Sequence, residues 1–128
     1  MTAMAVIALI IKPDEHPCVV PLLDNEEYLN HAVSIDTDIV GKADCMSLGN
    51  GVCVIFASQG TAFGQKGNRR IGKYAFAGTI YIVGMRKGKL RSLTDDEIIE
   101  YTTRYWEPDI ICEDELHDSW FDLLFDGA

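Results

Sequence analysis

The sequence of 128 residues lacks any hydrophobic run long enough to cross a bilayer. Its longest apolar run, from Ala3 to Ile11, is well short of the ~20 residues that a transmembrane helix needs. No Lys or Arg precedes this run, and no small-residue cleavage site follows it. We therefore expect no membrane segment, no secretory signal and a cytoplasmic location.

Close pairs of cysteines, of the kind that bind zinc, are also missing. The four cysteines and three histidines are scattered along the chain, and the cysteines form no Cys-x-x-Cys pair. A structural zinc site needs four ligands, which usually come as close pairs in the sequence. We therefore expect no metal and no cofactor, and four reduced thiols that are mostly buried as small hydrophobic side chains.

Basic residues are absent from the C-terminal end. Residues 1–106 hold all 11 Lys and Arg together with 12 of the 20 acidic residues, a net charge of −1. Residues 107–128 hold the other eight acidic residues, which gives a net charge of −8 out of the total of −9. The near-neutral body offers no general attraction to a phosphate backbone, whereas the acidic end suits a basic partner.

The pattern of apolar residues predicts an α+β fold. Hydrophobic residues make up 48% of the chain and charged residues 24%, as in an ordinary globular domain. An Asn-Gly pair at 50–51 between two apolar runs indicates a β-hairpin, and Thr94 with Glu97 forms a capping box that begins a helix. We expect strands at 4–11, 18–23, 43–48, 52–58 and 78–83, a weaker one at 35–40, and helices at 26–33, 94–106 and beyond 109.

This order of elements indicates a mainly antiparallel sheet of four to six strands with helices packed on one face. Residues 1–106 form the α+β body. Residues 107–128 form an acidic amphipathic helix or tail that belongs to the same domain. An exposed strand at the edge of the sheet could pair two copies into a homodimer.

Several short motifs resemble one known family. They are Ile10-Ile11-Lys12-Pro13, Asn68-Arg69, the strand from Ala77 to Gly84, and Ser92-Leu93-Thr94-Asp95 at the start of a helix. Over residues 5–106 the chain resembles the small proteins of phages, plasmids and bacteria grouped as domain of unknown function three-eight-four-six. The resemblance implies a mobile-element setting and an accessory role, and it supplies no catalytic residues. The acidic tail lies outside the shared pattern.

A glycine-rich basic segment at 60–74 is the first candidate binding site. It contains four glycines, four cations and no acidic residue. Glycines allow backbone N–H groups to face an anion, and Arg matches phosphate oxygens. The segment could hold a nucleotide or nucleic-acid phosphate through five residues: Lys66, Asn68, Arg69, Arg70 and Lys73. Alternatively, it is a connection whose charges are solvated or contact the acidic tail.

The acidic tail is the second candidate site. Aromatic and leucine side chains alternate with carboxylates near the C-terminus, as in helices that dock into a groove. We expect this tail to contact a basic host protein, such as a defence or other nucleic-acid-handling protein, through six residues: Asp118, Trp120, Phe121, Asp122, Leu124 and Phe125. Alternatively, the tail is structural and completes the core.

No residues are arranged as catalysis would require. Asp14-Glu15-His16 places carboxylates beside an imidazole, but adjacent residues in a turn rarely converge on one substrate, and no nucleophile is matched to them. We therefore expect a binding protein that acts by contact and is not an enzyme.

Overall fold

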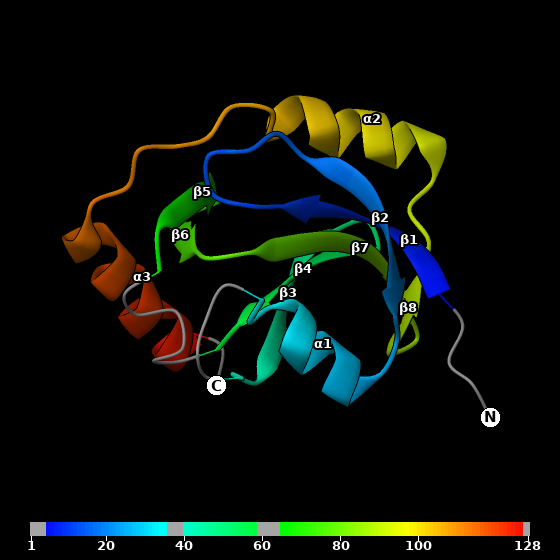
Figure 1. Ribbon diagram of the computed structural model, residues 1–128, viewed down its shortest axis with the longest axis horizontal. Coiled ribbons are helices and arrows are strands. Elements are labelled where there is room, and N and C mark those ends of the chain that lie inside the picture. Colours follow the sequence, from blue (N-terminus) through cyan, green and yellow to red (C-terminus); the bar gives the residue numbers. More distant parts are fainter. Residues whose placement is uncertain (1–4, 36–39, 59–64, 127–128) are drawn as a thin grey trace.

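The computed structural model describes residues 5–35, 40–58 and 65–126; in the last helix the side chains of 120, 121 and 123–126 are not described. Figure 1 shows the arrangement of the elements. In chain order these are β1 (Ala5–Ile11), β2 (Cys18–Leu23), α1 (Glu26–Ala32), β3 (Ala43–Gly49), β4 (Val52–Ala57), β5 (Gly67–Ile71), β6 (Tyr74–Ala77), β7 (Ile80–Arg86), β8 (Lys89–Arg91), α2 (Asp95–Arg104) and α3 (Glu113–Asp126).

The strands form one main antiparallel sheet and a separate hairpin. The main sheet has the order β2-β1-β7-β4-β3, with β8 paired to β7, and β5 pairs with β6. Every pair is antiparallel. The predicted α+β class with an antiparallel sheet is confirmed. The weak strand predicted at 35–40 falls mostly on residues 36–39, outside the described residues.

The two faces of the sheet are covered by different helices, so the prediction that helices pack on one face is wrong. Tyr101 and Tyr105, from α2 and its C-cap, join one core cluster with Leu9 of β1. On the opposite face, Ala32 of α1 belongs to the second core cluster, and Leu29 of the same helix packs against that cluster. Figure 1 shows α1 and α2 on opposite sides of the sheet. Adjacent β1 residues are buried in different clusters because strand side chains alternate between faces.

Turn and cap residues act as their chemistry predicts. Asn50 and Gly51 both have positive φ, as a two-residue type I′ hairpin turn requires. Thr94 and Glu97 make both bonds of the capping box, and Asn25 caps α1 by accepting a hydrogen bond from the Tyr28 N–H. α2 ends at Arg104, two residues before the predicted end.

The free edge of β2 is interrupted by a proline. The N–H of Ile7 donates to Ser92 Oγ, and its C=O accepts from the Leu93 N–H, so both point away from β2. Pro21 is paired with Ile7 and therefore turns its own backbone groups toward the open edge. Since proline has no N–H, this edge lacks a donor in its middle, which opposes pairing with another strand.

The free edge of β3 is capped by side chains. The Ala43 N–H donates to Asn30 Oδ1 at 2.7 Å, and the Cys45 N–H donates to Asp44 Oδ1 at 2.9 Å. A second strand that paired here would first have to displace both side-chain acceptors. Both ends of the main sheet thus carry features that oppose a homodimer formed by strand pairing.

The cysteines depart from expectation. Cys18, Cys45 and Cys112 are exposed, and Cys53 is the buried one. Burial raises the pKa of the Cys53 thiol to about 12, so that it stays protonated. Over the described residues, no helix is long and apolar enough to cross a membrane.

Replacement of the edge proline should promote self-association. Pro21→Val restores an N–H donor on the free edge of β2, and a two-fold strand pair would gain one such bond from each copy, each about 1 kcal/mol. Sedimentation velocity should show at least a threefold rise in the association constant. Val19→Thr, which adds no backbone donor on the same edge, is the control. An unchanged monomer in Pro21→Val would show that the proline does not protect this edge.

Stability should fall in acid through Glu97. Its carboxylate accepts two hydrogen bonds from Arg91, at 2.8 and 3.0 Å, and one from the Thr94 N–H. Chiefly the Arg91 bonds lower its pKa from the ordinary 4.5 to about 2. A depressed carboxyl pKa stabilises the fold above about pH 4.5, and this contribution is lost as the pH falls toward 2.

Glu97→Gln should therefore show a smaller drop in melting temperature between about pH 4.5 and pH 2 than the unaltered protein. Thermal melts followed by circular dichroism measure this. Glu100→Gln, which removes an exposed carboxylate from the same helix, should keep the full drop. The assignment fails if the two variants behave alike.

Candidate functional site

The basic segment forms a β-hairpin over much of its length, which the glycine-rich sequence did not predict. Residues 67–71 and 74–77 pair as β5 and β6, and 60–64 lie outside the described residues. The register shifts between Gly67 and Arg69, which marks a bulge. Because of this irregularity, the neighbouring side chains of Asn68 and Arg69 are both fully buried.

Asn68 and Arg69 are bonded to the body of the protein. The Asn68 amide donates to the carbonyl oxygens of Ile11 and Gly78, at 2.8 and 2.7 Å. Its Oδ1 accepts from Arg69 Nη1 at 2.8 Å. Arg69 also donates from Nε to the Tyr105 carbonyl at 2.9 Å and from Nη2 to the Glu15 carbonyl. One buried side chain thus joins the β1–β2 turn, the hairpin and the end of α2.

Main-chain and amide oxygens hold the Arg69 guanidinium. Burial lowers its pKa from the ordinary value, and the carboxylates of Asp109, Asp14 and Glu107 partly oppose this. Arg remains protonated in proteins, and the C-terminal end of a helix favours a positive charge. The bond to Tyr105, the C-cap of α2, uses this preference. The guanidinium of Arg69 is therefore buried and hydrogen-bonded to other parts of the protein, and it does not face solvent.

The other three candidate phosphate-binding residues have separate contacts. Lys66 pairs with Asp14, and Lys73 lies 5.2 Å from the centre of the Tyr74 ring. Arg70 is paired with carboxylates of the C-terminal segment. With Asn68 and Arg69 buried, the five residues do not form a common phosphate site in this structure.

Residues 107–126, here called the C-terminal arm, cover both open edges of the hairpin. Asp109 accepts a hydrogen bond from the Arg70 N–H at 2.8 Å, and its own N–H donates to the Asn68 carbonyl. On β6, the Ala75 N–H donates to Ser119 Oγ at 2.8 Å, and Ser119 is 5% exposed. A two-stranded hairpin is marginal alone, so these contacts supply partners that its edges would otherwise lack.

An arginine clamp fixes α3 to the hairpin. Arg70 Nε and Nη2 donate to the two carboxylate oxygens of Glu115, at 2.6 and 2.8 Å, and Nη2 also donates to the Ile110 carbonyl at 2.9 Å. The side chains are 46% and 35% exposed. The hydrogen bonds lower the pKa of Glu115 and raise that of Arg70. The proposed contact between basic segment and acidic tail is thus present, through Arg70.

Gly67 allows the arm to approach closely. A Cβ added at this position would lie 2.8 Å from Cβ of Ile111, closer than real side chains approach. Sequence reasoning missed Gly67, Asp109, Glu115 and Ser119. The contacts join residues 39 to 45 positions apart in the chain, and no local pattern reports such a pairing.

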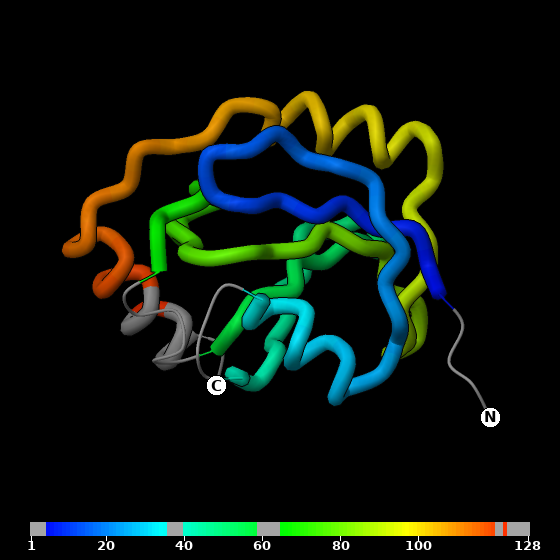
Figure 2. The backbone as a smooth tube through the Cα atoms, viewed as in Figure 1, coloured from blue at the N-terminus to red at the C-terminus, as the bar shows by residue number. Residues whose placement is uncertain are grey.

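The predicted partner surface is only partly visible. Asp118 and Asp122 are exposed on α3, while the side chains of Trp120, Phe121, Leu124 and Phe125 lie outside those described. α3 itself is docked and not free, with β6 as its main contact. Figure 2 shows the extended segment that leads from the end of α2 to α3.

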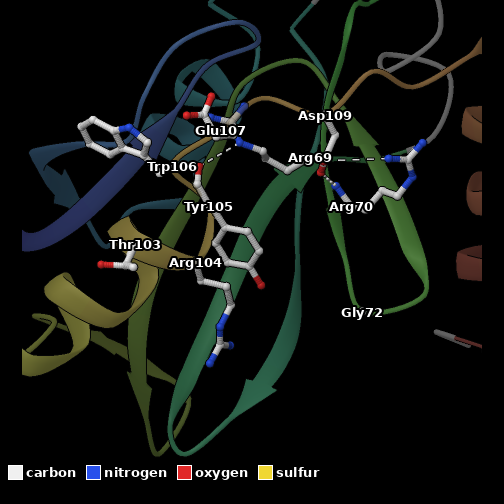
Figure 3. A pocket seen from close by; sticks show the side chains of 9 residues that line it. All are labelled: Arg69, Arg70, Gly72, Thr103, Arg104, Tyr105, Trp106, Glu107 and Asp109. Carbon is white, nitrogen blue, oxygen red and sulfur yellow. Dashed lines mark hydrogen bonds and ion pairs between the residues drawn. The ribbon is translucent and has the colours of Figure 1, made fainter.

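An open groove of about 510 Å³ lies between α2, the hairpin and the start of the arm. Figure 3 shows that the guanidinium groups of Arg69, Arg70 and Arg104 point in different directions. Arg104 is paired with Glu100 at 2.6 Å, so each of these cations has a partner within the protein. The groove is lined by Arg69, Arg70, Gly72, Thr103, Arg104, Tyr105, Trp106, Glu107 and Asp109.

The turn Asp14-Glu15-His16 holds the ends of elements together. The His16 ring stacks on Trp106 with centroids 3.9 Å apart, and its Nδ1 lies 2.6 Å from the Trp106 carbonyl oxygen. Asp14 pairs with Lys66, and Glu15 contributes its carbonyl to Arg69. The three residues therefore have separate structural contacts. Among the side chains that the structure describes, no three metal-ligating groups cluster.

The two neighbouring arginines should differ sharply in their effect on stability. Arg69→Met removes the donor to the buried Tyr105 carbonyl, the buried Asn68 Oδ1 and the partly buried Glu15 carbonyl, and it should lower the free energy of unfolding by about 3 kcal/mol. Arg70→Met opens an exposed contact and should cost much less. Urea denaturation of both variants measures this. Equal losses would contradict the assignment of Arg69 as the buried link.

Of the three comparisons with known proteins, only the one with family models gives a match. No curated protein and no solved structure matches the chain. The family model described as Domain of unknown function (DUF3846) matches residues 4–106, the body without the arm. The match covers most of the sequence, and the protein therefore belongs to the DUF3846 family.

Proposed function

We propose that this protein is a non-catalytic binding protein whose C-terminal helix contacts a basic partner protein. As the partner we propose a host protein that handles nucleic acid, in a phage or other mobile-element setting. Such proteins present basic surfaces, and the acidic helix would steer their approach.

The observation that carries the proposal is a stripe of carboxylates on α3. Asp114, Asp118 and Asp122 are four residues apart and all exposed. Spacing by four places them about 6 Å apart along one side of the helix. The residues that follow the first two, Glu115 and Ser119, contact the hairpin instead. α3 is thus held by one side while another side presents negative charge to solvent.

The stripe has a physical cost that a cationic partner would remove. Like charges at i and i+4 destabilise a helix by roughly 0.2–0.5 kcal/mol per pair. Residues 107–128 contain no Lys or Arg that could offset this repulsion from within the segment. A basic surface set against the stripe would relieve it and gain charge complementarity.

The test is capture of partners by the full-length protein. Asp114→Asn, Asp118→Asn and Asp122→Asn are combined in one variant, and cross-linked proteins from a bacterial lysate are identified by mass spectrometry. The unaltered protein should capture a basic protein that the variant loses at least tenfold. The fold is kept because these side chains are exposed.

The matched control makes the same change in net charge elsewhere. Glu26→Gln, Glu27→Gln and Asp96→Asn remove three exposed carboxylates from the starts of α1 and α2. This variant should capture the same protein as the unaltered chain. Equal loss in both variants would mean that overall charge acts and that α3 is not the binding surface.

A further inference from the structure

We propose that Arg70 occupies in cis the place that a partner's arginine takes on Glu115 of α3, so that a basic partner that engages Glu115 as well as the exposed stripe must open the clamp. The proposal rests on the function proposed above and adds its regulation: Glu115 belongs to the recognition surface, and Arg70 blocks it until a competing cation arrives.

The clamp has the geometry of arginine recognition. Two nitrogens of the Arg70 guanidinium face the two oxygens of Glu115, at 2.6 and 2.8 Å. This forked contact is the most specific way in which a carboxylate binds an arginine. Asp109 adds a second carboxylate, with Oδ1 at 3.9 Å from Nη1. The contact of the arm with Arg70 therefore shows the geometry in which Glu115 and Asp109 would bind an arginine of another protein.

The clamp is also exposed enough to exchange. Both side chains are partly open to water, and exposed ion pairs contribute little net stability. Apart from the clamp, Ser119 Oγ of α3 accepts a hydrogen bond from the Ala75 N–H of the hairpin. An external arginine can therefore replace Arg70 with little net loss of ionic contact.

The position of Glu115 beside the acidic stripe extends the surface. Glu115 follows Asp114 directly and precedes Asp118 by three residues. When the clamp opens, Glu115 joins a continuous acidic surface on α3. The Ala75 N–H, which donates to Ser119, then loses its acceptor if the helix leaves the hairpin. This amide is a direct reporter of whether α3 is docked.

Two matched variants separate the clamp from simple charge. Arg70→Gln and Arg104→Gln each remove one exposed arginine that is paired with a glutamate at 2.6 Å, and each changes the net charge equally. The Arg104 partner is Glu100 of α2, and so only Arg70→Gln opens the clamp. Hydrogen–deuterium exchange should show the Ala75 amide exchanging about fivefold faster in Arg70→Gln than in Arg104→Gln.

Binding is measured with a fluorescein-labelled nona-arginine peptide by anisotropy, at one fixed ionic strength because such contacts are screened by salt. Arg70→Gln should bind the peptide at least threefold more tightly than Arg104→Gln. The peptide should also speed exchange of the Ala75 amide in the unaltered protein. Glu115→Gln should bind more weakly than Arg70→Gln, since it opens the clamp but removes the acceptor.

The possible failures are distinct. If Arg70→Gln and Arg104→Gln bind equally, or if Ala75 exchange is the same in both, the cis competition is overturned. The acidic stripe then still stands if the triple aspartate variant loses the peptide. If the unaltered protein and all variants fail to bind the peptide, the acidic surface is not a site for basic partners, and both proposals fall.

Discussion

The buried guanidinium of Arg69 is the interaction on which the arrangement of the parts depends. The main sheet, the β5–β6 hairpin and α2 meet around it, and each offers an oxygen to the same side chain. A charge without solvent is costly unless every donor is satisfied, and this geometry holds only when all three parts are in place. The hairpin is thereby fixed as a platform for whatever packs on its outer side.

Arg69 and Arg70 show how adjacent residues of one type acquire opposite roles. The bulge in β5 turns Arg69 inward, and Arg70 remains at the surface. The inner arginine meets the backbone carbonyl oxygens of Tyr105 and Glu15 and the buried amide oxygen of Asn68, all of which are held in place by the fold. The outer arginine meets carboxylates of a segment that is joined to the body through an extended connection. The contacts of Arg69 are therefore fixed because their acceptors are held in the fold and shielded from water. Those of Arg70 can exchange because its acceptors are exposed carboxylates.

Much of the fold follows from local chemistry in the sequence. The strands at 43–49 and 52–57 surround an Asn-Gly turn, and α2 begins at a capping box, because these signals depend on residues within a few positions. The hairpin at 67–77 could not be found in this way. Its first strand reads Gly-Asn-Arg-Arg-Ile, and its burial depends on oxygens from Ile11, Glu15 and Tyr105 that only the folded chain brings together.

The candidate site, too, could be predicted only where it depends on local sequence. The excess of negative charge beyond residue 106 is visible in the composition, and the helix of the arm follows from its spacing of apolar residues. The identity of the clamp is not visible there, since Arg70 and Glu115 are 45 residues apart. The placement of helices on both faces is likewise not visible in the local sequence. It arises because each face of the main sheet carries its own cluster of apolar side chains, and each cluster packs against a different helix.

The close contact between Gly67 and Ile111 links two parts of the chain that the family boundary separates. Position 67 lies in the shared body, and position 111 lies in the arm beyond it. Any side chain at position 67 would meet Ile111 and push the start of the arm away from the hairpin. The docked position of the arm in this chain therefore depends on a glycine in the body as well as on the residues of the arm itself.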